Sequence, residues 1–211
     1  MIKVMIADDH ALVRRGLKQV VDEAGDMRMV AEADGWAGVQ QMLKEGDCDV
    51  LLLDISMPGK SGIEILKLVH ERLPRLPVLI LSMFPEDQYA MRALKAGASG
   101  YLTKDTAPDK LVDAIRAVSK GRRYITPEVA EALAATFTEG ERGDSPHKAL
   151  SDREFETLKL IASGKKLSEI AETMALSPKT VSVYRARLLE KMKLRNNAEI
   201  THYAVKNGLV D

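Results

Sequence analysis

Acidic and polar residues follow several short apolar runs in the first half of the chain. These residues are Asp8, Asp9, Asp54, Ser82 and Lys104. Clustered carboxylates repel one another, and a hard divalent cation such as Mg²⁺, which prefers oxygen ligands, relieves that repulsion. An aspartate held between such a cation and a lysine can act as a nucleophile toward a phosphoryl group. The pattern therefore predicts phosphoryl chemistry centred on a carboxylate.

The chemistry requires these residues to meet, and the surrounding pattern predicts how. Short apolar runs predict strands at Ile2–Ala7, Met29–Ala33, Val50–Leu53, Val78–Leu81 and Tyr101–Leu102. Longer stretches between them predict helices at Ala11–Glu23, Trp36–Lys44, Ile63–Arg72, Asp87–Ala96 and Pro108–Lys120. This alternation favours an α/β fold with a five-stranded, doubly wound parallel sheet. Ligands bind at the carboxyl ends of strands in such a sheet, where the polar residues stand.

Each residue alone has a simpler explanation. An aspartate after a strand often caps a helix or forms a turn, and a single lysine is usually solvated. Cys48 is better explained as a small buried hydrophobe than as a nucleophile. The histidines show no metal-ligand spacing: His10, His70, His147 and His202. The joint pattern, with different strand ends contributing, is what favours a site.

The remainder of the chain has a different pattern, which predicts helices and a linker. Pro127 begins an apolar-rich stretch that predicts one helix over Glu128–Phe137, and Thr138–Lys148 has no apolar residue and predicts an exposed linker. The last 60 residues predict only helices. Ser151–Glu154 fits a capping box, and Leu176-Ser177-Pro178 fits a turn before a basic helix that reaches about Lys193. The other helices are predicted at Glu169–Ala175, with Ser168 as its cap, and at Asn197–Lys206.

The net charge of zero hides a division between the halves. Residues 147–211 carry 12 Lys and Arg against 8 Asp and Glu, a net charge of +4, which leaves −4 on residues 1–146. This asymmetry hints that the C-terminal part meets a polyanion. A single cysteine excludes an intramolecular disulfide, and the absence of an 18-residue apolar run predicts a protein that does not enter the membrane and works in the cytoplasm.

A helical wheel separates two faces of the basic helix. Val181, Tyr184, Leu188 and Met192 share an apolar stripe, whereas the opposite face holds Ser182, Val183, Ala186, Arg187 and Glu190. Cations flank this second face and could reach phosphates: Lys179, Arg185, Lys191, Lys193 and Arg195. With the preceding short helix and turn, the pattern predicts a helix-turn-helix. A solvated basic helix in a small bundle is the alternative.

Residues 1–121 resemble the receiver domain of bacterial two-component response regulators, which is flavodoxin-like. The motifs that carry the resemblance are Asp8-Asp9-His10, Asp54–Gly59 with Gly62, Leu81-Ser82-Met83 and Gly97–Lys104. The resemblance implies that Asp54 becomes a 4-aspartylphosphate, with phosphate from a histidine kinase or phosphotransfer protein. It implies Mg²⁺ ligation by Asp9, Asp54 and the carbonyl of Ser56, with Asp8 acting partly through water.

The same resemblance assigns three further residues. Ser82 and Lys104 would hold the phosphoryl group, and Tyr101 would change rotamer together with Ser82. A half-buried strand aromatic is the alternative for Tyr101.

Residues 150–210 resemble the LuxR/NarL-type helix-turn-helix. The matching pieces include Leu150–Glu154, Glu169-Ile170-Ala171, Leu176–Val181 and Lys191–Leu194. The resemblance implies a recognition helix in the DNA major groove, with base contacts at Ser182, Val183 and Ala186. Val183 could meet a thymine methyl. Phosphate contacts are expected from Lys179, Thr180, Arg187 and Lys191.

Together these features identify a NarL/FixJ-type response regulator. We expect a receiver at 1–121, a linker with a short helix at 122–149 and an all-α DNA-binding domain at 150–211. Phosphorylation would control homodimerisation and binding to double-stranded promoter DNA, with RNA polymerase a further candidate partner. The receiver would catalyse only its own phosphorylation and dephosphorylation. The alternatives are a phosphorylation-independent DNA-binding regulator and an aspartyl-phosphate hydrolase; Ser56 argues against the hydrolase, which typically has a second acid there.

Overall fold

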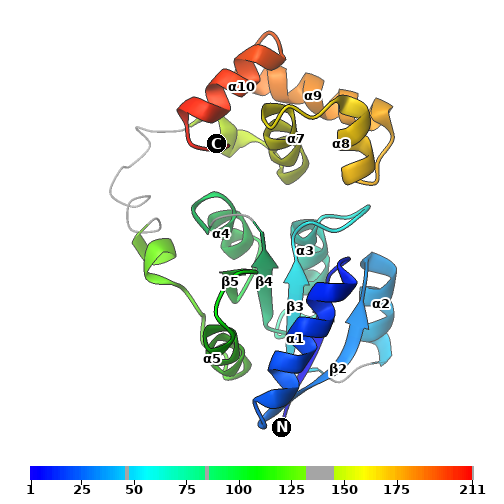
Figure 1. Cartoon of the computed structure of the whole chain (residues 1–211), viewed down its shortest axis with the longest axis vertical. Coiled ribbons are helices and arrows are strands. Elements are labelled where there is room, and N and C mark those ends of the chain that lie inside the picture. The colour runs from blue at the N-terminus through cyan, green and yellow to red at the C-terminus, as the bar shows by residue number, and fades with distance from the viewer. Residues whose placement is uncertain (46–47, 84–85, 132–144, 211) are drawn as a thin grey trace. The chain divides into compact units, whose positions relative to one another are not determined.

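The computed structural model describes residues 1–45, 48–83, 86–131 and 145–210 (Figure 1). The chain divides into two compact units, residues 1–137 and 138–211. The strands of the first unit are β1 (Ile2–Ala7), β2 (Met27–Ala33), β3 (Val50–Asp54), β4 (Val78–Ser82) and β5 (Gly100–Thr103). Its helices are α1 (Ala11–Glu23), α2 (Trp36–Glu45), α3 (Gly62–Arg72), α4 (Glu86–Lys95) and α5 (Pro108–Ser119).

The five strands form one parallel sheet in the order β2-β1-β3-β4-β5. The predicted doubly wound sheet is thus confirmed. Strand β5 begins one residue earlier than expected, at Gly100. A side chain there would lie 2.7 Å from the carbonyl oxygen of Tyr124, so the strand needs glycine at a position where strand propensity disfavours it.

Helices cover both faces of the sheet. Helices α1 and α5 pack on one face, and α2, α3 and α4 pack on the other. Alternate strand residues point to the α1/α5 face, where they form a buried apolar core that includes Val4, Ile6, Leu52, Leu79 and Leu81. The continuous apolar runs of β3 and β4 are explained by this double cover.

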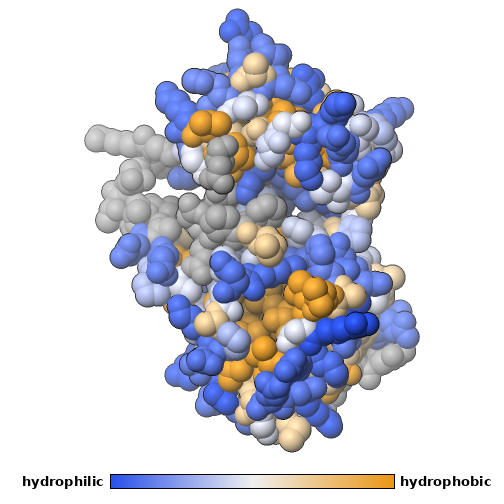
Figure 2. Space-filling view, viewed as in Figure 1, coloured by the Kyte–Doolittle hydropathy of each residue, from blue (hydrophilic) through white to orange (hydrophobic). Residues whose placement is uncertain are grey.

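A groove lies between α1 and α5 on the outer surface of this layer. Its apolar lining comes from Val20, Ala24, Pro108 and Val112. The space-filling view shows hydrophobic surface between these two helices, framed by hydrophilic side chains (Figure 2). The helical layer therefore leaves part of its apolar surface open in the single chain.

Four α-helices and one 3₁₀ helix are described in the second unit. They are η1 (Pro146–Ala149), α7 (Asp152–Ala162), α8 (Leu167–Thr173), α9 (Pro178–Met192) and α10 (Asn197–Lys206). Helix α7 packs against α8, α9 and α10, and buried apolar residues such as Phe155, Leu158, Ile170, Leu188 and Ile200 form the core. The predicted helix-turn-helix order is confirmed.

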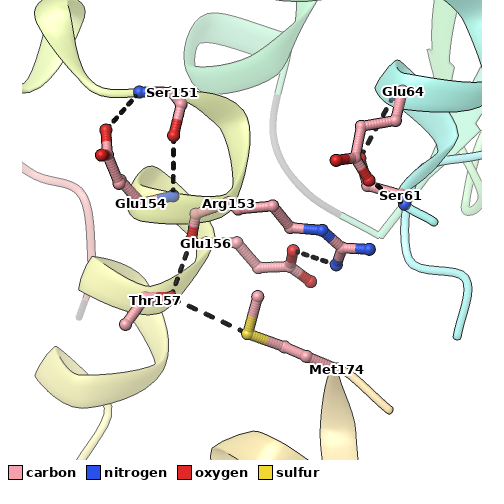
Figure 3. Close-up of polar contacts among 8 residues, drawn as sticks. All are labelled: Ser61, Glu64, Ser151, Arg153, Glu154, Glu156, Thr157 and Met174. Atoms are coloured by element: carbon pink, nitrogen blue, oxygen red, sulfur yellow. Dashed lines mark hydrogen bonds and ion pairs between the residues drawn. The ribbon is translucent and has the colours of Figure 1, made fainter. Parts of the chain in front are cut away.

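The helix starts predicted from the sequence at α7 and α9 are present. Ser151 Oγ accepts a hydrogen bond from the amide of Glu154, and the Glu154 carboxylate accepts one from the amide of Ser151 at 2.8 Å (Figure 3). Ser177 Oγ accepts from the amide of Thr180 at 3.1 Å, with Pro178 in the first turn. These caps satisfy amides that have no partner within the helix.

The start of α8 differs from the prediction. We expected a helix over Glu169–Ala175 capped by Ser168, but α8 spans Leu167–Thr173. The carboxylate of Glu169 accepts a hydrogen bond from the amide of Lys166 at 2.7 Å. Half of a capping box therefore fixes the start without a hydroxyl residue, and the expectation for Ser168 was wrong.

The segment between the units is described in part. Residues 127–131 are helical, as predicted from Pro127, and the rest of the predicted Glu128–Phe137 helix lies outside the described residues. Pro146–Ala149 forms η1, and His147 Nδ1 lies 2.8 Å from Tyr203 Oη of α10. These residues, expected to be linker, therefore pack on the helical unit.

Among the helices described, none combines the length and the apolar character needed to cross a bilayer.

Gly62 makes the closest approach between α3 and the end of β3. A Cβ atom there would lie 1.9 Å from the Asp54 carbonyl oxygen and 2.7 Å from Ile55 Cα. We expect Gly62→Ala to lower the free energy of unfolding by about 1–3 kcal/mol, because backbone must move to admit the methyl group. Urea unfolding measures the change.

Gly16 provides the matched control. It lies within α1, and nothing lies within 4 Å of a Cβ atom added there. Gly16→Ala should stabilise the chain by about 0.5–1 kcal/mol, because alanine has the better helix propensity. Equal unfolding midpoints for Gly62→Ala and Gly16→Ala would contradict the close approach.

Candidate functional sites

Four strand ends bring the predicted acidic-site residues together. Asp8 follows β1, Asp54 ends β3, Ser82 ends β4, and Lys104 follows β5. Because the strands are parallel and paired in register, their carboxyl ends share one edge of the sheet. The Lys104 amide also donates to the Ser82 carbonyl at 2.7 Å, which fixes the chain as it leaves β5.

Lys104 bridges the two buried carboxylates. Its Nζ lies 2.7 Å from Asp8 Oδ2 and 2.8 Å from Asp54 Oδ2, and the side chains of all three residues are almost fully buried. One ammonium therefore faces two carboxylates. Burial lowers the pKa of Lys104, but the charges of Asp54 and Asp8 outweigh this and hold it above its usual value.

The carboxylates keep unused hydrogen-bonding capacity. Asp8 Oδ2 and both Asp54 oxygens are buried without a hydrogen bond of ordinary geometry, although Lys104 lies at ion-pair distance. Burial raises the pKa of Asp54, the Lys104 charge opposes this, and the Asp8 charge adds to it, so the pKa lies above its usual range. Buried, unsatisfied carboxylate oxygens fit the ligand preference of a hard divalent cation.

His10 joins this cluster, which the sequence analysis did not predict. Ligand atoms of Asp8, Asp9, His10 and Asp54 lie within 4.8 Å of one another. His10 Nδ1 is 2.8 Å from Asp9 Oδ1, and the His10 amide donates to Asp8 Oδ1 at 2.8 Å. His10 thus stands beside carboxylates that could share a metal ion, although the spacing of the four histidines gave no sign of a metal site.

Arg14 is a second residue that the sequence analysis missed. Its guanidinium donates to the Asp8 carbonyl at 2.6 Å and lies 3.4 Å from Glu32 Oε2. The two contacts tie the first turn of α1 to the ends of β1 and β2. Helical spacing alone gives no signal for this, because Arg14 looks like any exposed cation in α1.

The other predicted site residues lie in or next to the strands that carry the cluster. Ser82 and Tyr101 are buried in β4 and β5, and Ser56 is half-buried two residues after the end of β3. Tyr101 is only 1% exposed, so the alternative of a half-buried strand aromatic does not describe it.

The recognition-helix candidate α9 has the two faces predicted by the wheel. Val181, Leu188 and Met192 are buried, whereas Ser182, Val183, Ala186 and Arg187 are exposed. Val183 is 43% exposed, which is unusual for a large apolar side chain. Ser182 Oγ donates to the Pro178 carbonyl at 2.9 Å, so its hydroxyl proton is already engaged.

Several cations expected to reach phosphates contact protein groups instead. Lys191 Nζ lies 2.6 Å from Glu154 Oε2, Arg185 Nε donates to Asn197 at 2.6 Å, and Arg195 pairs with Glu199 at 2.7 Å. Lys179 and Arg187 are exposed on α9. The seven predicted DNA-contact residues thus stay together on α9, but Lys191 is oriented toward α7.

Comparison with known families assigns both units. Residues 4–116 match the response regulator receiver domain, and residues 148–204 match the luxR family of bacterial regulatory proteins. The chain belongs to the two-component response regulators. It is a transcription-regulating response regulator with a LuxR-type helix-turn-helix.

Full-length relatives agree with this response-regulator assignment. The chain is 36% identical to the response regulator UvrY of Escherichia coli K12 over 99% of this chain and 96% of the relative. It is 36% identical to the response regulator GacA of Pseudomonas aeruginosa PAO1 over 100% and 99%. The order of the two units is therefore shared along the whole chain.

A solved structure of a response regulator is also similar. RcsB from Salmonella enterica serovar Typhimurium, bound to the promoter rprA with the phosphomimetic BeF₃⁻, has a TM-score of 0.66 and 29% identity. The match covers 96% of this chain and 97% of RcsB.

The excess carboxylate charge at the acidic edge predicts a stability effect. Asp54→Asn should raise the melting temperature of the metal-free regulator by roughly 2–6 °C at neutral pH, because it removes a buried charge that is incompletely compensated. Thermal unfolding in EDTA measures this. Mg²⁺ should raise the melting temperature of the wild type more than that of Asp54→Asn.

The pH dependence separates this effect from general acid sensitivity. The pKa of folded Asp54 exceeds its usual value of 3.8, so the wild type gains stability from this group as pH falls through the raised pKa toward 3.8. The advantage of Asp54→Asn should shrink over that window. Glu71→Gln, a change at an exposed carboxylate, should show no such trend. A metal-free Asp54→Asn that melts below the wild type at neutral pH would contradict the assignment.

Proposed function

We propose that Asp54 accepts a phosphoryl group in a Mg²⁺-dependent reaction and that this modification controls dimerisation and DNA binding. The observation that supports it most is the buried Asp54 carboxylate, which faces Lys104 and has no hydrogen bond of ordinary geometry. The donor is a histidine kinase or a phosphotransfer protein. We propose a receiver at 1–121, a linker at 122–149 and a DNA-binding domain at 150–211.

The nucleophile and its neighbours have distinct roles in the proposed transfer. An Asp54 carboxylate oxygen attacks the donor phosphorus, a P–O bond forms, and the P–N bond to the donor histidine breaks. Lys104 Nζ, already beside Asp54, neutralises charge on the transferred group. Ser82 donates a hydrogen bond to it, and Tyr101 turns with Ser82. The receiver thus catalyses its own phosphorylation and, by water attack on the acyl phosphate, its own dephosphorylation.

Asp9, Asp54 and the Ser56 carbonyl would hold Mg²⁺, with Asp8 acting through water. When bound, the cation neutralises the carboxylates and the incoming phosphoryl oxygens. The oxygen donor set and the unsatisfied buried oxygens support this choice of cation.

The output step uses the charge added at Asp54. A phosphoryl group brings further negative charge and strong acceptor oxygens, which draw Ser82 and Lys104 toward it. The regulator then pairs with a second copy, and two α9 helices meet paired half-sites on double-stranded promoter DNA. RcsB, a similar protein, has been solved with a promoter and as dimers on DNA. RNA polymerase is a further partner, and the cytoplasm is the site of action.

The proposed DNA contacts fall into two classes. Ser182, Val183 and Ala186 approach the bases with short side chains, and Val183 suits a thymine methyl. Phosphate contact is assigned to Lys179, Thr180 and Arg187. Lys191 belongs to the same helix but has the different environment described above.

The switch is tested by comparing phosphorylated wild type with Asp54→Ala. With Mg²⁺ and acetyl phosphate, the wild type should gain the mass of one phosphoryl group, form dimers and bind a duplex selected from a random-sequence pool. Asp54→Ala should gain no mass and bind that duplex on the order of tenfold more weakly. Mass spectrometry, sedimentation and fluorescence anisotropy provide the three readouts.

Asp105→Asn is the control, because it removes an exposed carboxylate next to Lys104 and should behave as the wild type. If Asp54→Ala matched the phosphorylated wild type in affinity and oligomeric state, the switch proposal would fail and phosphorylation-independent binding would replace it.

Phosphate contact by Lys179 is tested by salt dependence. Each neutralised phosphate contributes about 0.9 to the slope of log affinity against log salt concentration. Lys179→Met should therefore reduce the slope by about 0.9 on a random-sequence duplex. Lys148→Met, a change at an exposed lysine outside α9, should leave the slope unchanged. Equal slopes for wild type and Lys179→Met would remove Lys179 from the contact surface.

A further inference from the structure

A partly buried ion pair joins helix α9 to α7. Lys191 lies in the last turn of α9, and its Nζ is 2.6 Å from Glu154 Oε2 in the first turn of α7. The Glu154 side chain is only 3% exposed, and the Lys191 side chain is 42% exposed. The cation therefore extends from a partly solvated helix end toward an enclosed carboxylate.

Glu154 has a second role that fixes its position. Its carboxylate also accepts the hydrogen bond from the Ser151 amide at 2.8 Å, and Ser151 Oγ accepts from the Glu154 amide in return (Figure 3). The hydrogen bond at the start of α7 thus holds the carboxylate independently of Lys191. Burial raises the pKa of Glu154, but hydrogen bonds from Lys191 and Ser151 outweigh this, and the pKa lies below its usual range. Glu154 is therefore a carboxylate that favours its ionised form and is bound by two donors.

The ends of α9 are secured in different ways. At the start, Ser177 caps the helix and Val181 is buried, whereas at the end Met192 is buried and Lys193 is left-handed at φ 56°. The pair with Glu154 adds a directional contact to this second end. A helix held at both ends presents its exposed residues at one fixed angle.

We propose that Glu154 and Lys191 are positioning residues that set the orientation of α9 for base reading, and that Lys191 does not neutralise a DNA phosphate. The inference rests on the proposed DNA binding of α9 and departs from the family-based expectation for Lys191. A lysine bound to a buried carboxylate leaves no free positive charge for the DNA backbone. Its effect reaches the bases through Val183 and Ala186, which project from the same rigid helix.

The test uses the full chain, phosphorylated with acetyl phosphate, and two duplexes. One is a random-sequence duplex, and the other is the duplex that the wild type selects from a random pool. Lys191→Met should leave the salt slope on the random duplex unchanged. Its preference for the selected duplex should fall on the order of tenfold, because small rotations of α9 misplace the base contacts.

Conservative variants separate positioning from loss of folding. Lys191→Arg keeps a cation within reach of Glu154 and should retain most of the preference. Glu154→Gln keeps an acceptor for the Ser151 amide but loses the charge, and should lose preference as Lys191→Met does. The double variant Glu154→Gln/Lys191→Met should be no worse than either single variant, because the two residues act as one unit. Cooperative thermal unfolding confirms that each variant is folded.

Lys206→Met is the matched control, since it removes an exposed lysine from the last turn of α10. It should keep the preference of the wild type for the selected duplex. The proposal is overturned if Lys191→Met reduces the salt slope by about 0.9, as expected for Lys179→Met, with unchanged preference. It is also overturned if the pKa of Glu154, measured by NMR titration, is the same in Lys191→Met as in the wild type.

Failure of DNA binding as such would look different. If the phosphorylated wild type showed no preference for any duplex, the proposed function would fail, and the positioning role with it. The NMR titration would still report separately whether the ion pair forms.

Discussion

One ammonium shared by two buried carboxylates is the constraint on which the receiver unit depends. Lys104 lies within 2.8 Å of both Asp8 and Asp54, and three strand ends must meet for this to happen. Parallel pairing brings those ends to one edge, and Gly62 lets α3 approach the Asp54 backbone. Burial raises the pKa of Asp54, Lys104 offsets this only in part, and Asp8 competes for the same ammonium, so the site favours added positive charge. The sheet thus holds two buried carboxylates next to a single compensating ammonium.

In the helical unit, by contrast, cations are paired with acceptors of the same unit. Arg185, Lys191 and Arg195 all contact acceptors within this unit, so much of the positive charge near α9 is engaged before DNA arrives. The exposed face offers short side chains and Val183 in place of long cationic ones. Base reading by such a face depends on close approach and a fixed helix angle more than on charge. Packing of α9 on α7 is therefore part of recognition.

Sequence patterns predicted the elements well because burial dictates them. The apolar runs at Val50 and Val78 require a covered strand, and Ser151 with Glu154 specifies a helix start. Contacts that long side chains make with distant parts of the chain leave no such pattern in the sequence. Lys191 has a carboxylate partner 37 residues away, and its sequence neighbours look like those of any solvated lysine. His10 is a different case, because it directly follows Asp8 and Asp9 and this adjacency was a signal in the sequence.

Asp54 and Glu154 are both carboxylates removed from water, but their surroundings differ. The surroundings of Asp54 favour a chemical change at the carboxylate, and those of Glu154 favour a fixed position. Both are buried carboxylates beside a lysine, yet their pKa values move in opposite directions. At Asp54, burial dominates, Asp8 competes for the same ammonium, and the site is left able to bind a cation or a phosphoryl group. At Glu154, burial also raises the pKa, but Lys191 and the Ser151 amide overcome it, so the pKa lies below its usual range. Stronger burial and the second carboxylate of Asp8, and not the number of donors, therefore separate Asp54 from Glu154.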